Sequence, residues 1–258
     1  MIDNRDKQAV RGQSASSQLG PDAILDRIRA ALENEIRINL YRYPIKVAFA
    51  GDDIVLSGEV ADVAAKKIAL ELTGSIAPAV GLVDRLRVKP GQTMGDAELR
   101  DHIVKVLLDE PALDHCLLHS RLPQQLQTHR DGIADPVGTI VVEVRDGVVT
   151  LNGEVPSLSH KRLAGVLAWW VPGCRDVVNG LVGVPAQEDN DDELTDAVRL
   201  VLEKDPFINN TKVQVSSKNG LVTLDGLIPN QTMQRIAEHD AWFVFGVRDV
   251  ASKIQIKG

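Results

Sequence analysis

The chain has 258 residues and a formal net charge of −7, with 29 Lys and Arg against 36 Asp and Glu. Its length suits roughly one to three domains, and its acidic balance counts against nonspecific binding to nucleic acid or to a strongly anionic membrane. Two cysteines, Cys116 and Cys174, are too few for a disulfide framework and are expected to be reduced thiols.

The N-terminal stretch over 1–21 reads MIDNRDKQAVRGQSASSQLGP and is polar with mixed charge. It contains none of the apolar core that a secretory signal needs, so we expect a disordered tail and a cytoplasmic protein. A periplasmic location would follow only from a different native start. No later window approaches the roughly 20 apolar residues of a membrane span.

One sequence pattern occurs three times. GDDIVLSGEV begins at Gly51, DGVVTLNGEV at Asp146 and NGLVTLDGLI at Asn219, at offsets of 95 and 73 residues. Self-similarity at a long period indicates one structural unit used repeatedly. We therefore expect a tail over 1–21 and three tandem domains at 22–90, 95–185 and 191–258.

Each unit is predicted to fold as helix, strand, strand, helix, strand. In the first copy, Ile24, Ile28 and Leu32 recur at helical spacing, and equivalent apolar residues occur in the other two. Asp146-Gly147 and Asn219-Gly220 are turn sequences typical of β-hairpins. Each unit is therefore α+β, a three-stranded sheet packed on two helices.

Two sets of equivalent residues carry further expectations. A glycine is predicted to end the second strand of each unit, and the three are Gly58, Gly153 and Gly226. A basic residue follows in the second helix, where we expect it at the solvated edge, and the three are Lys67, Arg162 and Arg235. The last strands are predicted at Leu82–Val88, Val177–Val184 and Val250–Ile256.

The second unit is longer than the third. Its first helix aligns with that of the third at an offset of 95 residues, whereas its hairpin aligns at 73, so it holds 22 extra residues (95 less 73). The insertion lies at about 112–138, between the first helix and the first strand.

Histidines in the insertion form a candidate metal site. If the helix continues, His115 and His119 lie four residues apart on one face, a spacing that lets two imidazoles bind one metal ion. Cys116 or His129 would supply a third ligand. These donors suit zinc, copper or iron, so a transition metal or haem is the candidate cofactor. The alternative is that they are surface polar residues of a loop.

Aromatic residues follow the second helix in two of the units. Trp169 aligns with Trp242 and Trp170 with Phe243, whereas the first unit has Gly74-Ser75 there. Such rings could enter a lipid headgroup layer or pack between domains, since they combine apolar area with a polar edge. In either case these four residues are candidates for an interface.

The third copy resembles a BON domain, the module named for bacterial osmotic-stress and nodulation proteins. The features are the helix ending at Asp205-Pro206, the hairpin NGLVTLDG, the helix containing Arg235-Ile236-Ala237 and the sequence from Phe245 to Val250. The second copy shares DGVVTLNGEV and Pro172-Gly173, while the first has Pro78 in place of that glycine. The resemblance implies three tandem BON-like domains and association with phospholipid surfaces, envelope maintenance, osmotic stress or ion sensing.

No catalytic signature is present: the chain lacks a G-x-S-x-G elbow, a P-loop, an H-E-x-x-H motif and a Rossmann glycine fingerprint. We therefore expect no enzymatic activity. The leading hypothesis is a scaffold that binds a phospholipid surface or a protein partner, with no nucleic-acid partner. The alternatives are a metal, ion or haem sensor that uses the insertion, and a self-assembling structural protein that forms homo-oligomers.

Overall fold

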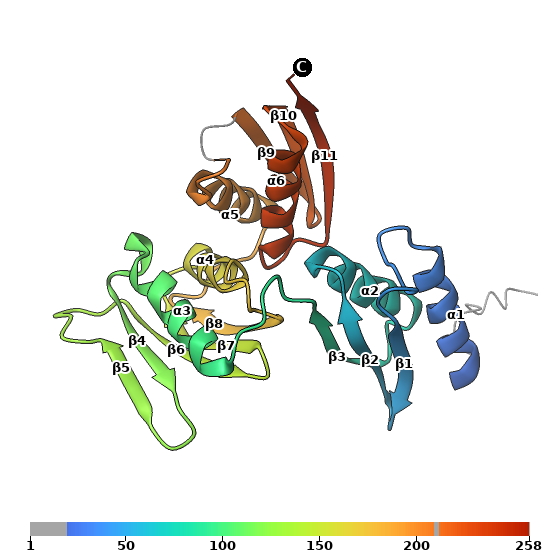
Figure 1. Ribbon diagram of the computed structural model, residues 1–258, viewed down its shortest axis with the longest axis horizontal. Coiled ribbons are helices and arrows are strands. Elements are labelled where there is room, and N and C mark those ends of the chain that lie inside the picture. The colour runs from blue at the N-terminus through green and yellow to red at the C-terminus, as the bar shows by residue number, and fades with distance from the viewer. Residues whose placement is uncertain (1–19, 209–211, 258) are drawn as a thin grey trace, which may run out of the picture.

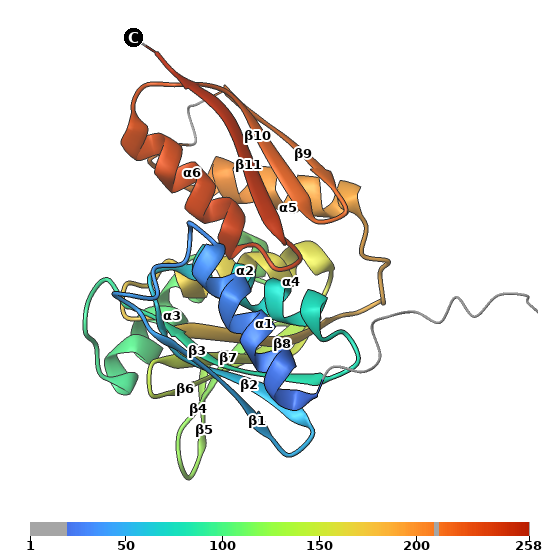
Figure 2. The same cartoon turned by 90° about the vertical axis from the view of Figure 1, so that its right-hand side faces the viewer.

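A computed structural model of the chain describes residues 20–208 and 212–257 (Figure 1). Three domains follow one another in the order of the repeats, and they form a triangle rather than a line. Domain 3 lies across the top of domains 1 and 2 in both views (Figures 1 and 2). Residues 1–19 of the predicted tail lie outside the described residues, whereas Pro21 already begins the first helix.

Domain 1 consists of α1 (Pro21–Asn34), β1 (Ile45–Ala50), β2 (Asp53–Val60), α2 (Val63–Ile76) and β3 (Gly81–Val88). β1 and β2 form an antiparallel hairpin, and β3 pairs with β2 in parallel, which requires α2 as a crossover. The helices bury Ile28, Leu32 and Ala69 against Ile54 and Leu56 of the sheet.

Domain 3 repeats this topology with α5 (Asp191–Lys204), β9 (Lys212–Lys218), β10 (Leu221–Ile228), α6 (Gln231–Phe243) and β11 (Asp249–Ile256). The second helix of every domain begins at an equivalent capping residue whose side chain accepts a backbone N–H of the first turn. The three caps are Asp62, Ser157 and Asn230.

Domain 2 consists of α3 (Asp96–Leu108), the short 3₁₀ turn η1 (Pro111–Leu113), β4 (Cys116–Arg121), β5 (Leu126–Arg130), β6 (Gly138–Arg145), β7 (Val148–Val155), α4 (Leu158–Trp169) and β8 (Asp176–Gly183). The insertion forms the hairpin β4–β5. β4 pairs in parallel with the outer edge of β6, so the sheet order is β5-β4-β6-β7-β8. The predicted α+β class is confirmed, but the sheet of domain 2 has five strands rather than three.

A turn that begins with an acidic residue follows the first helix in all three domains, and it is not among the predicted features. Glu35, Glu110 and Asp205 each accept, through the side chain, the backbone N–H two residues later, at 3.0, 2.9 and 2.7 Å. The residue one step further along is buried in each domain, and the three are Ile38, Leu113 and Ile208. The sequence signal for this turn is an acidic residue three positions before a buried apolar residue. In the second and third copies a proline follows the acidic residue, whereas the first copy has Ile36 there, which makes the pattern hard to recognise.

The glycines predicted to end the second strand lie inside it, because β2, β7 and β10 each continue for two more residues. Gly153 shows why glycine is needed. Its φ is 122°, and a Cβ would lie 2.0 Å from the carbonyl oxygen of Thr139 on the neighbouring strand. Any other residue would force the hairpin apart at this point.

Among residues 20–208 and 212–257, every helix is too short or too polar to span a bilayer.

Candidate binding site and interdomain contacts

The centre of the molecule is the meeting point of the second helices of the three domains. α6 packs against both α2 and α4 (Figures 1 and 2). The apolar cores of domains 1 and 3 join into one cluster that includes Val166 of α4, whereas the rest of domain 2 has a core of its own. The domains are therefore docked through buried apolar surface.

The four candidate aromatic residues lie at this junction. Trp242 is 6% exposed in the shared core of domains 1 and 3. Trp169 stacks on Phe243 with ring centroids 5.8 Å apart and planes 11° apart, and Trp170 donates its indole N–H to Asp240 of α6 at 2.8 Å. Trp169, Trp170 and Phe243 thus meet between domains 2 and 3, whereas Trp242 packs between domains 1 and 3. Packing between domains is one of the two roles that the sequence left open, the other being lipid contact.

Two of the three basic residues expected at a solvated edge are not solvated. The Lys67 ammonium donates to the carbonyls of Trp242, Val244 and Val247 at 2.7, 2.9 and 3.2 Å. Burial lowers the pKa of Lys67 to about 7, while the carbonyls at the C-terminal end of α6 favour the charged amine.

Arg162 is 2% exposed and binds the same turn of domain 3. Its Nε donates to the carbonyl of Phe245 at 3.0 Å, and its Nη2 pairs with Asp189. Arg235, at the equivalent position of α6, is exposed as predicted. The prediction was wrong for Lys67 and Arg162 because domain docking, which no local pattern encodes, buries both.

An Arg-Asp pair begins the last strand of domains 2 and 3, and both pairs dock on domain 1. Asp176, which is buried, binds Lys66 at 2.7 Å and Arg87 at 2.9 Å, and Arg175 pairs with Glu59 at 3.4 Å. The equivalent pair in domain 3 makes separate contacts: Asp249 binds Arg37 at 2.8 Å, and Arg248 pairs with Glu71. Domain 1 has Val80-Gly81 at this position.

Two buried carboxyl groups lie where domain 3 meets Trp170. Asp240 is 2% exposed, and its Oδ2 has no hydrogen-bond partner among the described residues. Burial, followed by the neighbouring carboxyl of Asp205, raises the pKa of Asp240 to about 8, although the Trp170 N–H favours the ionised form. Asp240 is therefore largely protonated at neutral pH.

The stability of the protein should fall between about pH 4 and about pH 8 because of Asp240. Its folded pKa lies above the unfolded value of 3.8, so its contribution is complete below that value and is lost as pH rises through the folded pKa. The loss is on the order of a few kcal/mol.

Asp240→Asn should flatten this dependence, because the amide keeps an acceptor for Trp170 and cannot ionise. The measurement is the urea midpoint at pH 5 and pH 8 for both proteins. Subtracting the variant from the wild type removes the contributions of Lys67 and of the histidines. Parallel pH profiles would contradict the assignment.

The four candidate metal ligands do not converge. α3 ends at Leu108, so the helix that would align His115 and His119 is absent; His115 precedes β4 and His119 lies within it. His119 Nδ1 lies 3.1 Å from the Thr128 hydroxyl, whereas His129 Nε2 lies 2.8 Å from the Ser120 hydroxyl on the opposite face of the hairpin. Cys116 is buried, and burial raises its pKa.

The helical premise of the metal hypothesis is therefore wrong. Within residues 20–208 and 212–257, no three His, Cys, Asp or Glu side chains are grouped as metal ligands would be. The segment is a strand in which alternate residues, Cys116, Leu118 and Ser120, are buried. Burial of every second residue is the period of a strand and not of a helix.

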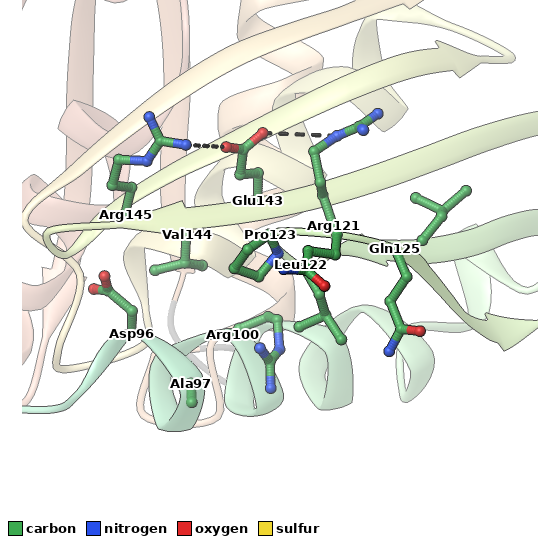
Figure 3. Close-up of a pocket in the computed structure, with 12 residues that line it drawn as sticks. Asp96, Ala97, Arg100, Arg121, Leu122, Pro123, Gln125, Glu143, Val144 and Arg145 are labelled. Atoms are coloured by element: carbon green, nitrogen blue, oxygen red, sulfur yellow. Dashed lines mark hydrogen bonds and ion pairs between the residues drawn. The ribbon is translucent and has the colours of Figure 1, made fainter.

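The insertion instead forms one wall of a cleft of about 890 Å³ (Figure 3). Asp96, Ala97 and Arg100 of α3 line one side, and the hairpin tip from Leu122 to Gln125 lines the other. Figure 3 shows Arg145, Glu143 and Arg121 in a row along the strands, with Leu122 and Pro123 between that row and α3. The volume lies within the range of roughly 300–1,000 Å³ that is usual for ligand sites.

Both carboxylates that line this cleft already have partners. The Glu143 carboxylate is shared by Arg145 at 3.1 Å and Arg121 at 3.7 Å, and the Asp96 carboxylate accepts the N–H groups of Asp146 and Gly147 at 2.8 and 2.9 Å. The guanidinium groups have more N–H donors than these contacts use. The cleft therefore suits a ligand that supplies acceptor oxygens.

These features define the class of protein, an array of small α+β domains docked on one another through apolar and ionic contacts. The chain belongs to the BON domain family: the BON domain matches residues 119–185 and 190–258, which is more than half of the chain, and a BON-like domain matches 46–90. The predicted resemblance is confirmed for all three copies. Family membership supports a binding or scaffold role rather than catalysis.

Two solved structures cover most of the chain, and both are of CdsD, a structural protein of the type III secretion system of Chlamydia trachomatis. The CdsD C-terminal domain is 14% identical, with 91% of this chain and 98% of that chain covered and a TM-score of 0.24. The second is 15% identical, with 91% and 92% covered and the same TM-score. That score is too low for the likeness to support an argument. No curated protein matches the chain.

Proposed function

We propose that this protein is a non-enzymatic scaffold that holds three BON domains in a fixed arrangement and binds a protein partner in the cleft of domain 2. The cleft between α3 and the β4–β5 hairpin carries the proposal. It is built by the insertion, which is the part of domain 2 that departs from the shared unit.

The ionic docking supports a fixed arrangement. Lys66 and Asp176 are both more than nine-tenths buried between domains 1 and 2, and a buried pair of this kind holds its elements in one register. A rigid array presents the cleft in one orientation, which lowers the entropic cost of binding a partner.

A protein partner is favoured over a phospholipid surface because of where the aromatic rings lie. Trp242 is buried, and Trp169, Trp170 and Phe243 are half-buried against neighbouring domains. Insertion of these rings into lipid would require the domains to separate.

Site-specific photocrosslinking in cells tests the proposal. Benzoylphenylalanine replaces Gln124, an exposed residue of the cleft, and in a matched variant it replaces Glu33, an exposed residue of α1. We expect a discrete protein adduct from position 124 alone. The same adducts at both positions, or none at 124, would count against the cleft.

Sedimentation with vesicles of equal parts phosphatidylglycerol and phosphatidylcholine tests the lipid version. The wild-type protein should stay in the supernatant. If the wild type pellets with the vesicles and Trp169→Ala does not, the partner is a phospholipid surface and not a protein.

Self-assembly is the second candidate, and one observation favours it. β4 covers the outer edge of β6, whereas β1 and β9 end their sheets at the equivalent position. Uncovered edges can pair between molecules. A mass by light scattering that stays monomeric across concentrations would remove this candidate.

A further inference from the structure

A second cavity, of about 330 Å³, lies at the junction of the three domains. Its walls are Ala64 at the start of α2, Pro90 of the linker after β3, Cys174 of domain 2, and Trp242 and Phe243 of α6. It is separate from the cleft of domain 2 and shares no residue with it. Ligand sites occur preferentially at such domain junctions.

The walls of this junction cavity are held in place from each side. Two backbone hydrogen bonds fix the linker to domain 2. The N–H of Val88 donates to the carbonyl of Arg175 at 2.8 Å, and the N–H of Gln92 donates to the carbonyl of Pro172 at 3.1 Å. The end of α6 is fixed to α2 by Lys67, which donates to the carbonyl of Trp242 at 2.7 Å. The cavity is thus part of the docked arrangement.

The chemistry of the walls indicates the kind of ligand. Trp242, Phe243 and His239 offer ring surface, and most of the other uncharged walls are aliphatic, which favours a flat apolar body that packs against rings. Of the charged residues that line the cavity, Asp62 already accepts the N–H of Ala65 at 2.8 Å. Lys89 is an exposed residue, and its ammonium lies 5.9 Å from the centroid of the Tyr43 ring.

We propose that the junction cavity binds a small aromatic molecule carrying an anionic group, with its rings against Trp242 and Phe243 and its anion toward Lys89. Since the walls come from all three domains, such a ligand binds only the docked arrangement. It therefore stabilises that arrangement by mass action.

Fluorescence titration with 1-anilinonaphthalene-8-sulfonate, an aromatic anion, tests the proposal on the full chain. We expect one molecule bound per chain, with emission excited by energy transfer from tryptophan. Ala64→Phe fills the cavity from α2 and should weaken binding at least tenfold. Ala31→Phe adds the same ring to a partly exposed position of α1 away from the cavity and should bind as the wild type.

Two results would overturn the site: no saturable binding to the wild type, or an Ala64→Phe variant that binds like the wild type. A cooperative thermal transition, followed by circular dichroism, shows that each variant is folded. If Ala64→Phe does not fold, Lys89→Glu, an exposed substitution, decides the matter. It should weaken binding of the sulfonate several-fold and leave the neutral probe N-phenyl-1-naphthylamine unchanged; equal binding of both probes would contradict the anionic requirement.

Discussion

Arg162→Ala is expected to lower the free energy of unfolding by about 3 kcal/mol, near the lower end for removal of one member of a buried ion pair. The Arg162 side chain is 1% exposed and holds the carbonyl of Phe245 and the carboxylate of Asp189. Its removal leaves the carbonyl without its donor and opens a void beside Gly246. The value stays at the lower end because Asp189 is 48% exposed and is rehydrated easily.

The repeat supplies the matched control. Arg235→Ala removes the same side chain from the equivalent position of α6, where it is exposed, and should change stability by less than about 0.5 kcal/mol. Urea unfolding followed by circular dichroism measures both variants. Equal effects would mean that the contact between α4 and the turn after α6 is not made in solution.

Trp242→Ala is expected to cost about 3 to 5 kcal/mol, the range for truncation of a buried tryptophan. The ring is 6% exposed in the core that domains 1 and 3 share, so its loss should weaken the docking as well as domain 3. We expect the wild type to unfold in a single urea transition, and we expect that transition to broaden or divide in the variant because the domains lose their coupling.

Phe245→Ala is the control for Trp242→Ala. Phe245 lies three residues further along the same turn, is 53% exposed and has the Lys161 ammonium 5.1 Å from its ring centroid. It should cost no more than about 1 kcal/mol, the value of an exposed cation–π contact. Comparable losses at 242 and 245 would show that Trp242 is not buried at a domain junction.

The repeats made most of the fold predictable, because each helix and strand can be compared among three aligned copies of the same unit. The turns at Asp146-Gly147 and Asn219-Gly220 placed two of the hairpins correctly. The insertion was read wrongly because His115 and His119 have helical spacing, whereas the burial of Cys116 and Leu118 follows the period of a strand. The spacing of two histidines predicts secondary structure less reliably than the spacing of the apolar residues does.

The candidate site was less predictable than the fold. The aromatic residues were predicted as candidates for an interface or for lipid contact from their recurrence at one position of the repeat. Lys67 and Arg162 were missed, because a basic residue on a helix has the same local pattern whether it faces water or the turn of another domain. The cleft in Figure 3 depends on where the hairpin tip lies relative to α3, and no pairwise pattern in the sequence specifies that distance.

Domain 1 receives the Arg-Asp pairs of both other domains and offers no such pair itself. It also precedes both of them in the chain, and domains generally fold as units in the order of their synthesis. Domain 2 is therefore made when domain 1, on which it docks, has already folded. Domain 3 is made when both of the domains on which it docks have folded. Trp242 and Phe243 of domain 3 therefore meet packing partners that are already folded, whereas Trp169 and Trp170 of domain 2 gain theirs only when domain 3 is made.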